Sequence, residues 1–550
     1  MSWTSITQAK RVLSAEQGAV VKDWGGRLPV ALLYPNAYHV GMSSLAIHGL
    51  YRMLNLRPDV ACERVFCGYR RLVLADAPLS LETQRDLTEF KVLAVSFSFE
   101  LDYLNFAALL RSSGIPALAR MRDQSYPLVL AGGPAVSANP APMSALCDAF
   151  FIGEVEESLP TLVDTLRAGI DGERGQLLRA LAQIPGVYVP ESGICSTAVA
   201  STRTTSPDSS RRDASATQTP TLPIARQWLR DLDAHPTHTV VFSRGTEFGD
   251  MYLLEIGRGC ARGCRFCLAG CIYRPVRERS PRVLLAQARD GRTHRAKVGL
   301  VSAAVSDYAQ IDDLLSGLQR LDMRISVSSL RVDPLPESLL AALAASGART
   351  LTIAPEAGSE RLRQSINKRV RREHILDAAA RAATHRFSEL KLYFMLGLPG
   401  EEEADVQAIV DLVRDVAAAF HGRIAASIVP FVPKAHTPFE REPMASDQIL
   451  RQRMNALRTG LRPLRVRLTT DSLAWARVQA VLARGDHQLG LVLADMHAPS
   501  LAEWERALLQ HGLNSDTYTG ARNSKDPPPW GIVSMASGPR GAFTSALAAG

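Results

Sequence analysis

Apolar residues in the first third of the chain form short continuous runs, separated by amphipathic stretches. The runs at 28–34, 92–97, 128–131 and 149–152 have the length of buried strands. The stretches at 43–56, 103–113 and 156–168 carry apolar residues at helical spacing. Continuous apolar strands that alternate with helices are typical of a parallel sheet covered on both faces. We therefore predict a doubly wound α/β domain over residues 27–190, preceded by an N-terminal extension at 1–26.

A second alternation of strands and helices begins near residue 223. Its six strand candidates are 252–256, 298–303, 324–328, 350–354, 389–396 and 425–429. Its helical stretches include 310–321, 336–346, 372–385 and 401–419. Six strand–helix repeats predict a partial, open (β/α)6 barrel over residues 223–440 rather than a closed eight-stranded one.

Two further regions differ in composition from these domains. Residues 191–222 are rich in serine and threonine and contain no aromatic residue, which predicts a flexible linker. Residues 441–550 begin with a helical, arginine-rich stretch and end in a segment rich in Gly, Pro and Ser. We interpret them as a small, mostly helical accessory region.

Three closely spaced cysteines carry the strongest chemical signal. Cys260, Cys264 and Cys267 lie on one loop directly after the first barrel strand, at the strand end where α/β folds place their active sites. Three thiolates can hold a [4Fe-4S] cluster and leave one iron open to a small ligand. Neighbouring arginines, Arg258 among them, place positive charge beside this anionic cluster. A zinc site usually needs a second ligand pair, and Cys271 as a fourth ligand remains an alternative.

Net charge and composition limit the other functional classes. The formal charge is +8 and the pI is about 9.1, so nucleic acid is one candidate partner, although arginines spread over solvated helix faces explain this charge better. No apolar run reaches the roughly 20 residues of a membrane span, and the first ten residues lack an apolar signal core. We therefore expect a cytoplasmic protein without a membrane span, and sparse cysteines argue against disulfides.

The ends of the later barrel strands carry residues suited to a cofactor. Ser329 and Arg331 follow the third strand, and a guanidinium can grip a carboxylate through two parallel hydrogen bonds. Glu356 ends the fourth strand, where its carboxylate can accept hydrogen bonds from hydroxyl or amino groups. Gly397 and Gly400 follow the fifth strand and allow close approach of a ligand. Each residue alone is also explained by turn and helix-start chemistry.

The CxxxCxxC spacing, with Phe266 before its last cysteine, resembles the radical S-adenosylmethionine superfamily. The resemblance implies that the open iron binds S-adenosylmethionine and that reductive cleavage gives a 5'-deoxyadenosyl radical. Glu356 and the Gly397–Gly400 run look like the ribose and adenine contacts of that superfamily, and Arg331 looks like a contact to the cofactor carboxylate or the substrate. The resemblance also implies an electron donor of the flavodoxin or ferredoxin type.

The first domain extends the resemblance to a subfamily with an N-terminal cobalamin-binding domain. Gly132 and Gly133 form a turn after a strand and are the candidate cobalamin contacts. The Asp-x-His-x-x-Gly run, whose histidine ligates cobalt in many such domains, does not occur in this sequence. His39 lies in the corresponding loop and is a candidate substitute ligand, although a turn histidine is the simpler interpretation.

Three functional hypotheses follow. The first is a cobalamin-dependent radical enzyme that transfers a methyl group to, or rearranges, an unactivated carbon. The second is a corrinoid-independent enzyme that modifies tRNA or another macromolecule, similar to methylthiotransferases, which hold a second cluster on three cysteines of their first domain; Cys62, Cys67 and Cys147 are the thiols available here. The third is a non-catalytic cluster protein. The residue pattern identifies neither the substrate nor a catalytic residue.

Overall fold

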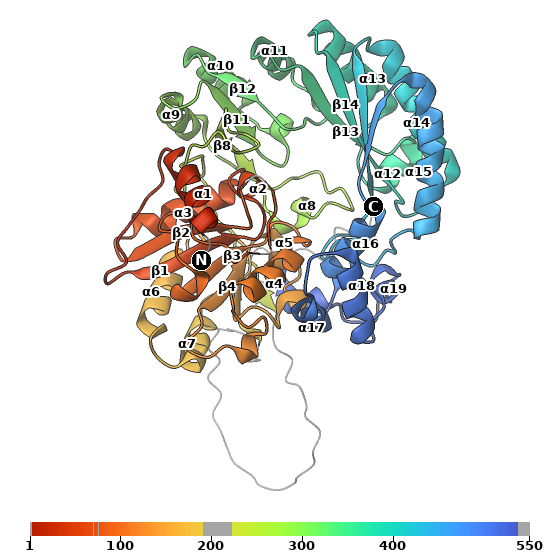
Figure 1. The fold of residues 1–550 in the computed structure, drawn as a ribbon. Helices are drawn as coiled ribbons and strands as arrows, with labels where there is room; N and C mark the ends of the chain where they lie inside the picture. The colour runs from red at the N-terminus through yellow and green to blue at the C-terminus, as the bar shows by residue number, and fades with distance from the viewer. Residues whose placement is uncertain (1–2, 70, 75, 191–222, 537–550) are drawn as a thin grey trace, which may run out of the picture.

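The computed structural model describes residues 3–69, 71–74, 76–190 and 223–536. Figure 1 shows a first domain drawn in red to orange, a barrel in green to blue, and C-terminal helices that return to the first domain. The predicted linker at 191–222 lies outside the described residues. Among the residues described, no helix has the length and apolar character to cross a membrane.

The first domain is the predicted doubly wound sheet. Its strand order is β2-β1-β3-β4-β5-β6, and every neighbouring pair is parallel except β5 with β6. The strands are β1 Leu28–Tyr34, β2 Val60–Phe66, β3 Val92–Ser96, β4 Leu128–Gly132, β5 Ala149–Phe151 and β6 Val187–Tyr188. The helices are α1 Trp3–Ser14, α2 Tyr38–Gly41, α3 Leu45–Leu56, α4 Asp102–Ser112, α5 Pro134–Ala138, α6 Leu159–Gly169 and α7 Arg174–Leu181.

Alternate side chains of β1 enter two separate cores. Leu32 packs in one core with side chains of α3, α6 and α7. Leu33 packs in the other with side chains of α4 and of the C-terminal helices. Because successive strand residues point to opposite faces, the sheet is buried on both sides, as its continuous apolar runs predicted.

The barrel is parallel, as predicted, and is divided into two sheets. The first has the order β12-β11-β8, and the second has the order β13-β14-β15-β16. Its strands are β8 Tyr252–Glu255, β11 Lys297–Val301, β12 Arg324–Ser326, β13 Thr350–Glu356, β14 Glu389–Leu396, β15 Arg423–Pro430 and β16 Arg467–Thr470. Between β12 and β13 one bridge joins Leu330 to Ile353, and a polar cleft of about 350 Å³ opens beside it.

Strand β16 adds a seventh parallel strand that the apolar pattern did not predict. It comes from the region expected to be accessory and pairs with β15. The barrel helices are α9 Pro281–Arg292, α10 Ile311–Arg320, α11 Glu337–Ala345, α12 Glu360–Ser365, α13 Arg372–Thr384, α14 Glu403–Ala419 and α15 Asp447–Leu461. The short elements around the cysteines are β9 Gly257–Arg258, α8 Ala269–Ile272 and β10 Arg277–Glu278.

The C-terminal helices connect the barrel to the first domain. They are α16 Leu473–Arg484, α17 Gln488–Asp495, α18 Leu501–Gln510 and α19 Ser515–Thr519. Helix α17 packs on α4, and the Asn139 side chain donates hydrogen bonds to the carbonyl oxygens of Ala483 and Gly485. The short strand β17 (Val533–Ser534) pairs in parallel with β7 (Ile224–Ala225). The region therefore braces both domains.

Candidate active site

The three cysteines lie on the loop between β9 and α8, at the carboxyl end of β8. Gly259 has φ +89°, and a Cβ atom there would lie 2.4 Å from the Tyr273 carbonyl oxygen, so only glycine fits this turn. The Cys267 amide donates to the Cys264 carbonyl oxygen at 3.1 Å. Burial raises the pKa of the Cys264 thiol, and the nearby cations Lys368 and Arg331 oppose that rise.

The three thiols of the loop do not gather around a single ion position. Over the described ranges, no three His, Cys, Asp or Glu side chains converge closely enough to hold one ion, as zinc would require with its ligands about 2.3 Å from the metal. In an iron–sulfur cluster each thiolate binds a different iron, so the sulfurs stand farther apart. Burial raises the pKa of Cys267, and the backbone amides of Gly270 and Ala269 oppose it by donating hydrogen bonds to the sulfur. Hydrogen bonds from these two amides would stabilise the thiolate form of Cys267.

Contacts from later strands hold the cysteine loop in place. The Arg262 guanidinium donates to both carboxylate oxygens of Asp307, at 2.8 and 2.5 Å. The Asn367 amide donates to the Gly263 carbonyl oxygen at 2.8 Å. Because Asp307 follows β11 and Asn367 follows α12, the loop is fixed on two sides by the barrel.

Two of the predicted cofactor residues lie close to this loop. Arg331 is 13 % exposed, its Nε is 4.0 Å from Asp307, and its charge acts on the Cys264 thiol. Glu356 ends β13 with φ +69°, an unusual conformation for a side-chain-bearing residue. Its carboxylate accepts a hydrogen bond from Lys368 Nζ at 2.8 Å. The pair places opposite charges beside the cysteines, and the sequence pattern had not singled out Lys368.

The other predicted cofactor residues have different surroundings. Ser329 is exposed and lines the cleft between β12 and β13. Gly397 has φ +81°, and a Cβ atom there would lie 2.7 Å from a Leu450 methyl group. Its amide donates to Glu401 at 2.7 Å. Gly400 has φ +73° with open space beside it. Packing against α15 therefore explains Gly397, while Gly400 leaves room for a ligand.

A cavity of about 770 Å³ connects the first domain to the cysteine loop. Its walls are the sheet face of β1, β3 and β4, the facing sides of α3 and α6, and the segment 257–259 next to Cys260. Most of the lining is apolar. Gly132 and Gly133 both line it, and Gly133 has φ +102° with its Cβ position 2.6 Å from the Phe97 carbonyl oxygen. The predicted glycine turn therefore brings the backbone to the cavity wall.

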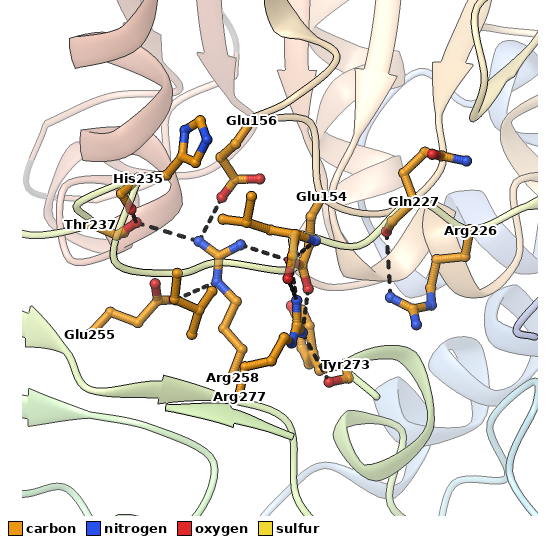
Figure 2. Close-up of polar contacts among 12 residues, drawn as sticks. Glu154, Glu156, Arg226, Gln227, His235, Thr237, Glu255, Arg258, Tyr273 and Arg277 are labelled. Atoms are coloured by element: carbon orange, nitrogen blue, oxygen red, sulfur yellow. Dashed lines mark hydrogen bonds and ion pairs between the residues drawn. The ribbon is translucent and has the colours of Figure 1, made fainter. Parts of the chain in front are cut away.

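A buried ionic network forms the wall where the two domains meet. Figure 2 shows the Arg258 guanidinium reaching from β9 toward Glu154 and Glu156 of the first domain. The nitrogen–oxygen distances are 3.1 Å to Glu154, 2.6 Å to Glu156 and 2.9 Å to Glu255. Arg277 donates to both oxygens of Glu154, at 2.7 and 2.8 Å. Despite burial, these arginines lower the pKa of Glu154 below its usual value.

This network corrects one expectation from the sequence. Arg258 does not present a free positive charge to the cysteines, because three carboxylates surround it. The charge of Arg262 is likewise balanced by Asp307. Lys368 and Arg331 also act on the Cys264 thiol, but Lys368 is paired with Glu356 at 2.8 Å and the Arg331 Nε lies 4.0 Å from Asp307.

The remaining candidate residues lie apart from the cavity or from one another. His39 Nε2 is 3.6 Å from Glu247, and the residue is not part of the cavity lining. Cys271 lies on α8, and burial raises its pKa to about 11. Cys62 packs on one face of the first sheet, whereas Cys67 and Cys147 pack in the core on the other face. These three thiols therefore do not converge.

Two family models match the chain in the order of its domains. Residues 46–190 match the model for the N-terminal part of radical SAM proteins, and residues 254–413 match the model for the radical SAM superfamily. Together they cover more than half of the chain. The chain belongs to the radical SAM superfamily. Members of this superfamily use a [4Fe-4S] cluster and S-adenosylmethionine and need a reductant, so the two cofactors predicted from the cysteine spacing are confirmed.

Related proteins resemble this radical SAM chain to different extents. An uncharacterised protein of Methanocaldococcus jannaschii is 30 % identical over 84 % of this chain and 90 % of its own length. A tRNA-2-methylthio-N(6)-dimethylallyladenosine synthase of Cereibacter sphaeroides is 29 % identical over 34 % of this chain and 46 % of its own. Only part of that synthase is therefore matched.

Solved structures match the chain at lower sequence identity. The radical S-adenosylmethionine methyltransferase TsrM of Kitasatospora setae has a TM-score of 0.49 and 14 % identity, with 75 % of each chain covered. The cobalamin-dependent S-adenosylmethionine radical enzyme OxsB has a TM-score of 0.46 and 15 % identity, with 70 % of this chain and 52 % of its own covered. None of these values assigns a reaction to the chain.

Proposed function

We propose that this radical SAM enzyme holds cobalamin in the cavity between its two domains and transfers a methyl group to, or rearranges, an unactivated carbon. The carrying observation is the 770 Å³ cavity, which runs from the first sheet to the residue beside Cys260. Its largely apolar walls and its glycine turn suit a bulky, flat ligand whose reacting face must lie near the cluster. A low-potential flavodoxin or ferredoxin would supply electrons.

The chain's own residues fall into three groups in this proposal. Cys260, Cys264 and Cys267 hold the cluster, and Gly132 and Gly133 line the corrinoid cavity. The residues proposed to orient S-adenosylmethionine are Ser329, Arg331, Glu356, Lys368 and Gly400, while Gly397 is explained by its packing against α15. When bound, the cluster and S-adenosylmethionine supply a carbon-centred radical, and cobalamin supplies a transferable methyl group.

Charges close to the cysteines support this division. The amino-acid end of S-adenosylmethionine carries one ammonium and one carboxylate. Glu356 and Lys368 present the complementary pair of charges, 2.8 Å apart and mostly buried. Arg331 adds a second cation whose charge acts on Cys264. Opposite charges held this way orient a zwitterion more strongly than a neutral surface does.

A corrinoid-independent, methylthiotransferase-like enzyme is the alternative, and the partial match to the synthase of Cereibacter sphaeroides favours it. A methylthiotransferase-like enzyme would hold a second cluster in its first domain. Cys62 lies on the opposite sheet face from Cys67 and Cys147, so the fold would have to rearrange to gather them. The geometry therefore favours one cluster.

Anaerobic purification with cobalamin supplied tests the proposal. We expect about four irons and one corrinoid per chain, with 5'-deoxyadenosine formed from S-adenosylmethionine under reduction. In Gly132→Leu the new side chain would project into the cavity without a backbone clash, because its Cβ position meets only the Phe151 carbonyl oxygen at 3.8 Å. This variant should keep its iron and lose the corrinoid.

A matched glycine variant serves as the control. Gly25 does not line the cavity, and its Cβ position contacts only the Asp23 carboxylate, at 3.5 Å or more. Gly25→Leu should therefore keep both iron and corrinoid. A wild-type protein that contains iron but binds no corrinoid would exclude the cobalamin-dependent function, and eight irons per chain would favour the alternative.

A further inference from the structure

The interdomain cavity is lined by two regions of different character. Gly259, the residue before Cys260, belongs to one of them. Apolar side chains of α3 and α6 form the other, and Leu56 of α3 is 66 % exposed. A ligand that fills the cavity would therefore contact both the cluster loop and α3.

Ionic side chains are rare in this lining. They are Arg52, Glu154, Glu156, Glu255 and Arg258. The three carboxylates are bound by Arg258, Arg277 and Arg279. This group is concentrated at one wall and is balanced within itself, so it offers no net charge to a ligand.

Arg52 is different because its charge is uncommitted. It lies on α3, one helical turn before Leu56, and is half-buried. In the part of the chain that the structure describes, its guanidinium forms no hydrogen bond or ion pair. Its charge nevertheless reaches nearby groups, since it helps burial to lower the pKa of His238. A half-buried guanidinium without a partner in an apolar cavity favours an anionic ligand group.

These features together define the ligand. It has a large apolar body for the slot between α3 and α6 and one anionic group near Arg52. We propose that Arg52 binds the phosphodiester of the nucleotide tail of cobalamin, with the base of that tail in the apolar slot. This inference rests on the proposed function. It adds a specificity residue that selects a complete corrinoid with its nucleotide tail.

Comparison of cobalamin with cobinamide, which lacks the nucleotide tail, tests this role by direct binding. We expect wild-type protein to prefer cobalamin. In Arg52→Gln the dissociation constant of cobalamin should rise roughly ten- to a hundredfold, the usual effect of losing one charge-assisted hydrogen bond, while that of cobinamide stays unchanged. Arg52→Lys should retain part of the preference. Arg11→Gln, which removes an exposed arginine outside the lining, should change neither constant.

Other results would overturn the assignment in distinguishable ways. If Arg52→Gln weakens the binding of cobalamin and cobinamide equally, or the binding of neither, the role of Arg52 is overturned and the proposed function remains intact. A lipid phosphate shares the required chemistry, so dodecyl phosphate is the third probe. If Arg52→Gln weakens the binding of dodecyl phosphate but leaves the affinity for cobalamin unchanged, the slot is assigned to a lipid. Failure of wild-type protein to bind either corrinoid would overturn the proposed function as well.

Discussion

Replacement of Arg258 by methionine should loosen the contact between the two domains. Glu154 keeps Arg277 at 2.7 Å, and Glu255 keeps Arg279 at 2.5 Å. Glu156 has Arg258 as its sole ion-pair partner among the residues described, and its side chain is 10 % exposed. The substitution therefore leaves one buried carboxylate unpaired. Breaking a buried pair costs about 3–5 kcal/mol, and a single orphaned group favours the lower end of that range.

A cost of about 3 kcal/mol raises the opening equilibrium of the interface by roughly two orders of magnitude. Native-state hydrogen exchange measures this opening in the peptides that cover 152–158 and 252–259. Exchange there should accelerate by about that factor in Arg258→Met. Most of the protection should return in the double variant with Glu156→Gln, since the orphaned charge is gone.

A surface pair supplies the control for this experiment. Arg414 and Asp411 form an exposed ion pair on α14. Arg414→Met should change the free energy of interface opening by less than about 1 kcal/mol, so exchange in both interface peptides should stay nearly unchanged. Unchanged exchange of both interface peptides in Arg258→Met would refute the reasoning. So would a double variant that exchanges as fast as the single one, because the orphaned carboxylate would then not be the cause.

Three shorter predictions concern the cluster, the first domain and the cofactor site. Cys264→Ala should lose the iron and the cleavage of S-adenosylmethionine, whereas Cys147→Ser should keep about four irons per chain; equal loss in both would contradict the single-cluster arrangement. Burial raises the pKa of Asp102 to about 7, so its contribution to stability is present below pH 4 and is lost as the pH rises toward 7. The free energy of unfolding of the wild-type protein should therefore fall by at most about 4 kcal/mol between pH 4 and pH 7, and this fall should be absent in Asp102→Asn. Glu356→Gln should weaken S-adenosylmethionine binding roughly tenfold in equilibrium dialysis without loss of iron, and unchanged affinity would remove Glu356 from the cofactor site.

Most strands were predictable because burial on both faces requires continuous apolar runs. Strand β2 was missed because Glu63 and Arg64 interrupt its pattern, although the whole strand is buried. Their charges are satisfied by groups distant in the sequence: Arg64 binds Glu16 and Glu82, and Glu63 accepts from the Trp24 indole. Strand β16 was missed because its residues are largely exposed and begin with arginine.

The candidate site was predictable where its signal is local. Cys260, Cys264 and Cys267 are neighbours in sequence, so their spacing alone indicated a cluster loop. The pairing of Glu154 with Arg258 spans 104 positions, and no local pattern indicates which arginine meets which carboxylate. Arg52 gave no signal at all, because an arginine on an amphipathic helix normally faces solvent.

The pairing of β7 with β17 has a consequence for how the protein is made. Residues 224–225 meet 533–534, so the first partner leaves the ribosome roughly 300 residues before the second, some tens of seconds at 5–20 residues per second. During this interval the C-terminal region is not yet complete. The hydrogen bond that Trp530 Nε1 donates to the Glu440 carboxylate at 2.6 Å therefore cannot form until Trp530 has been synthesised. The cysteine loop is therefore synthesised before Trp530 can join Ile272 of α8 in their shared apolar cluster.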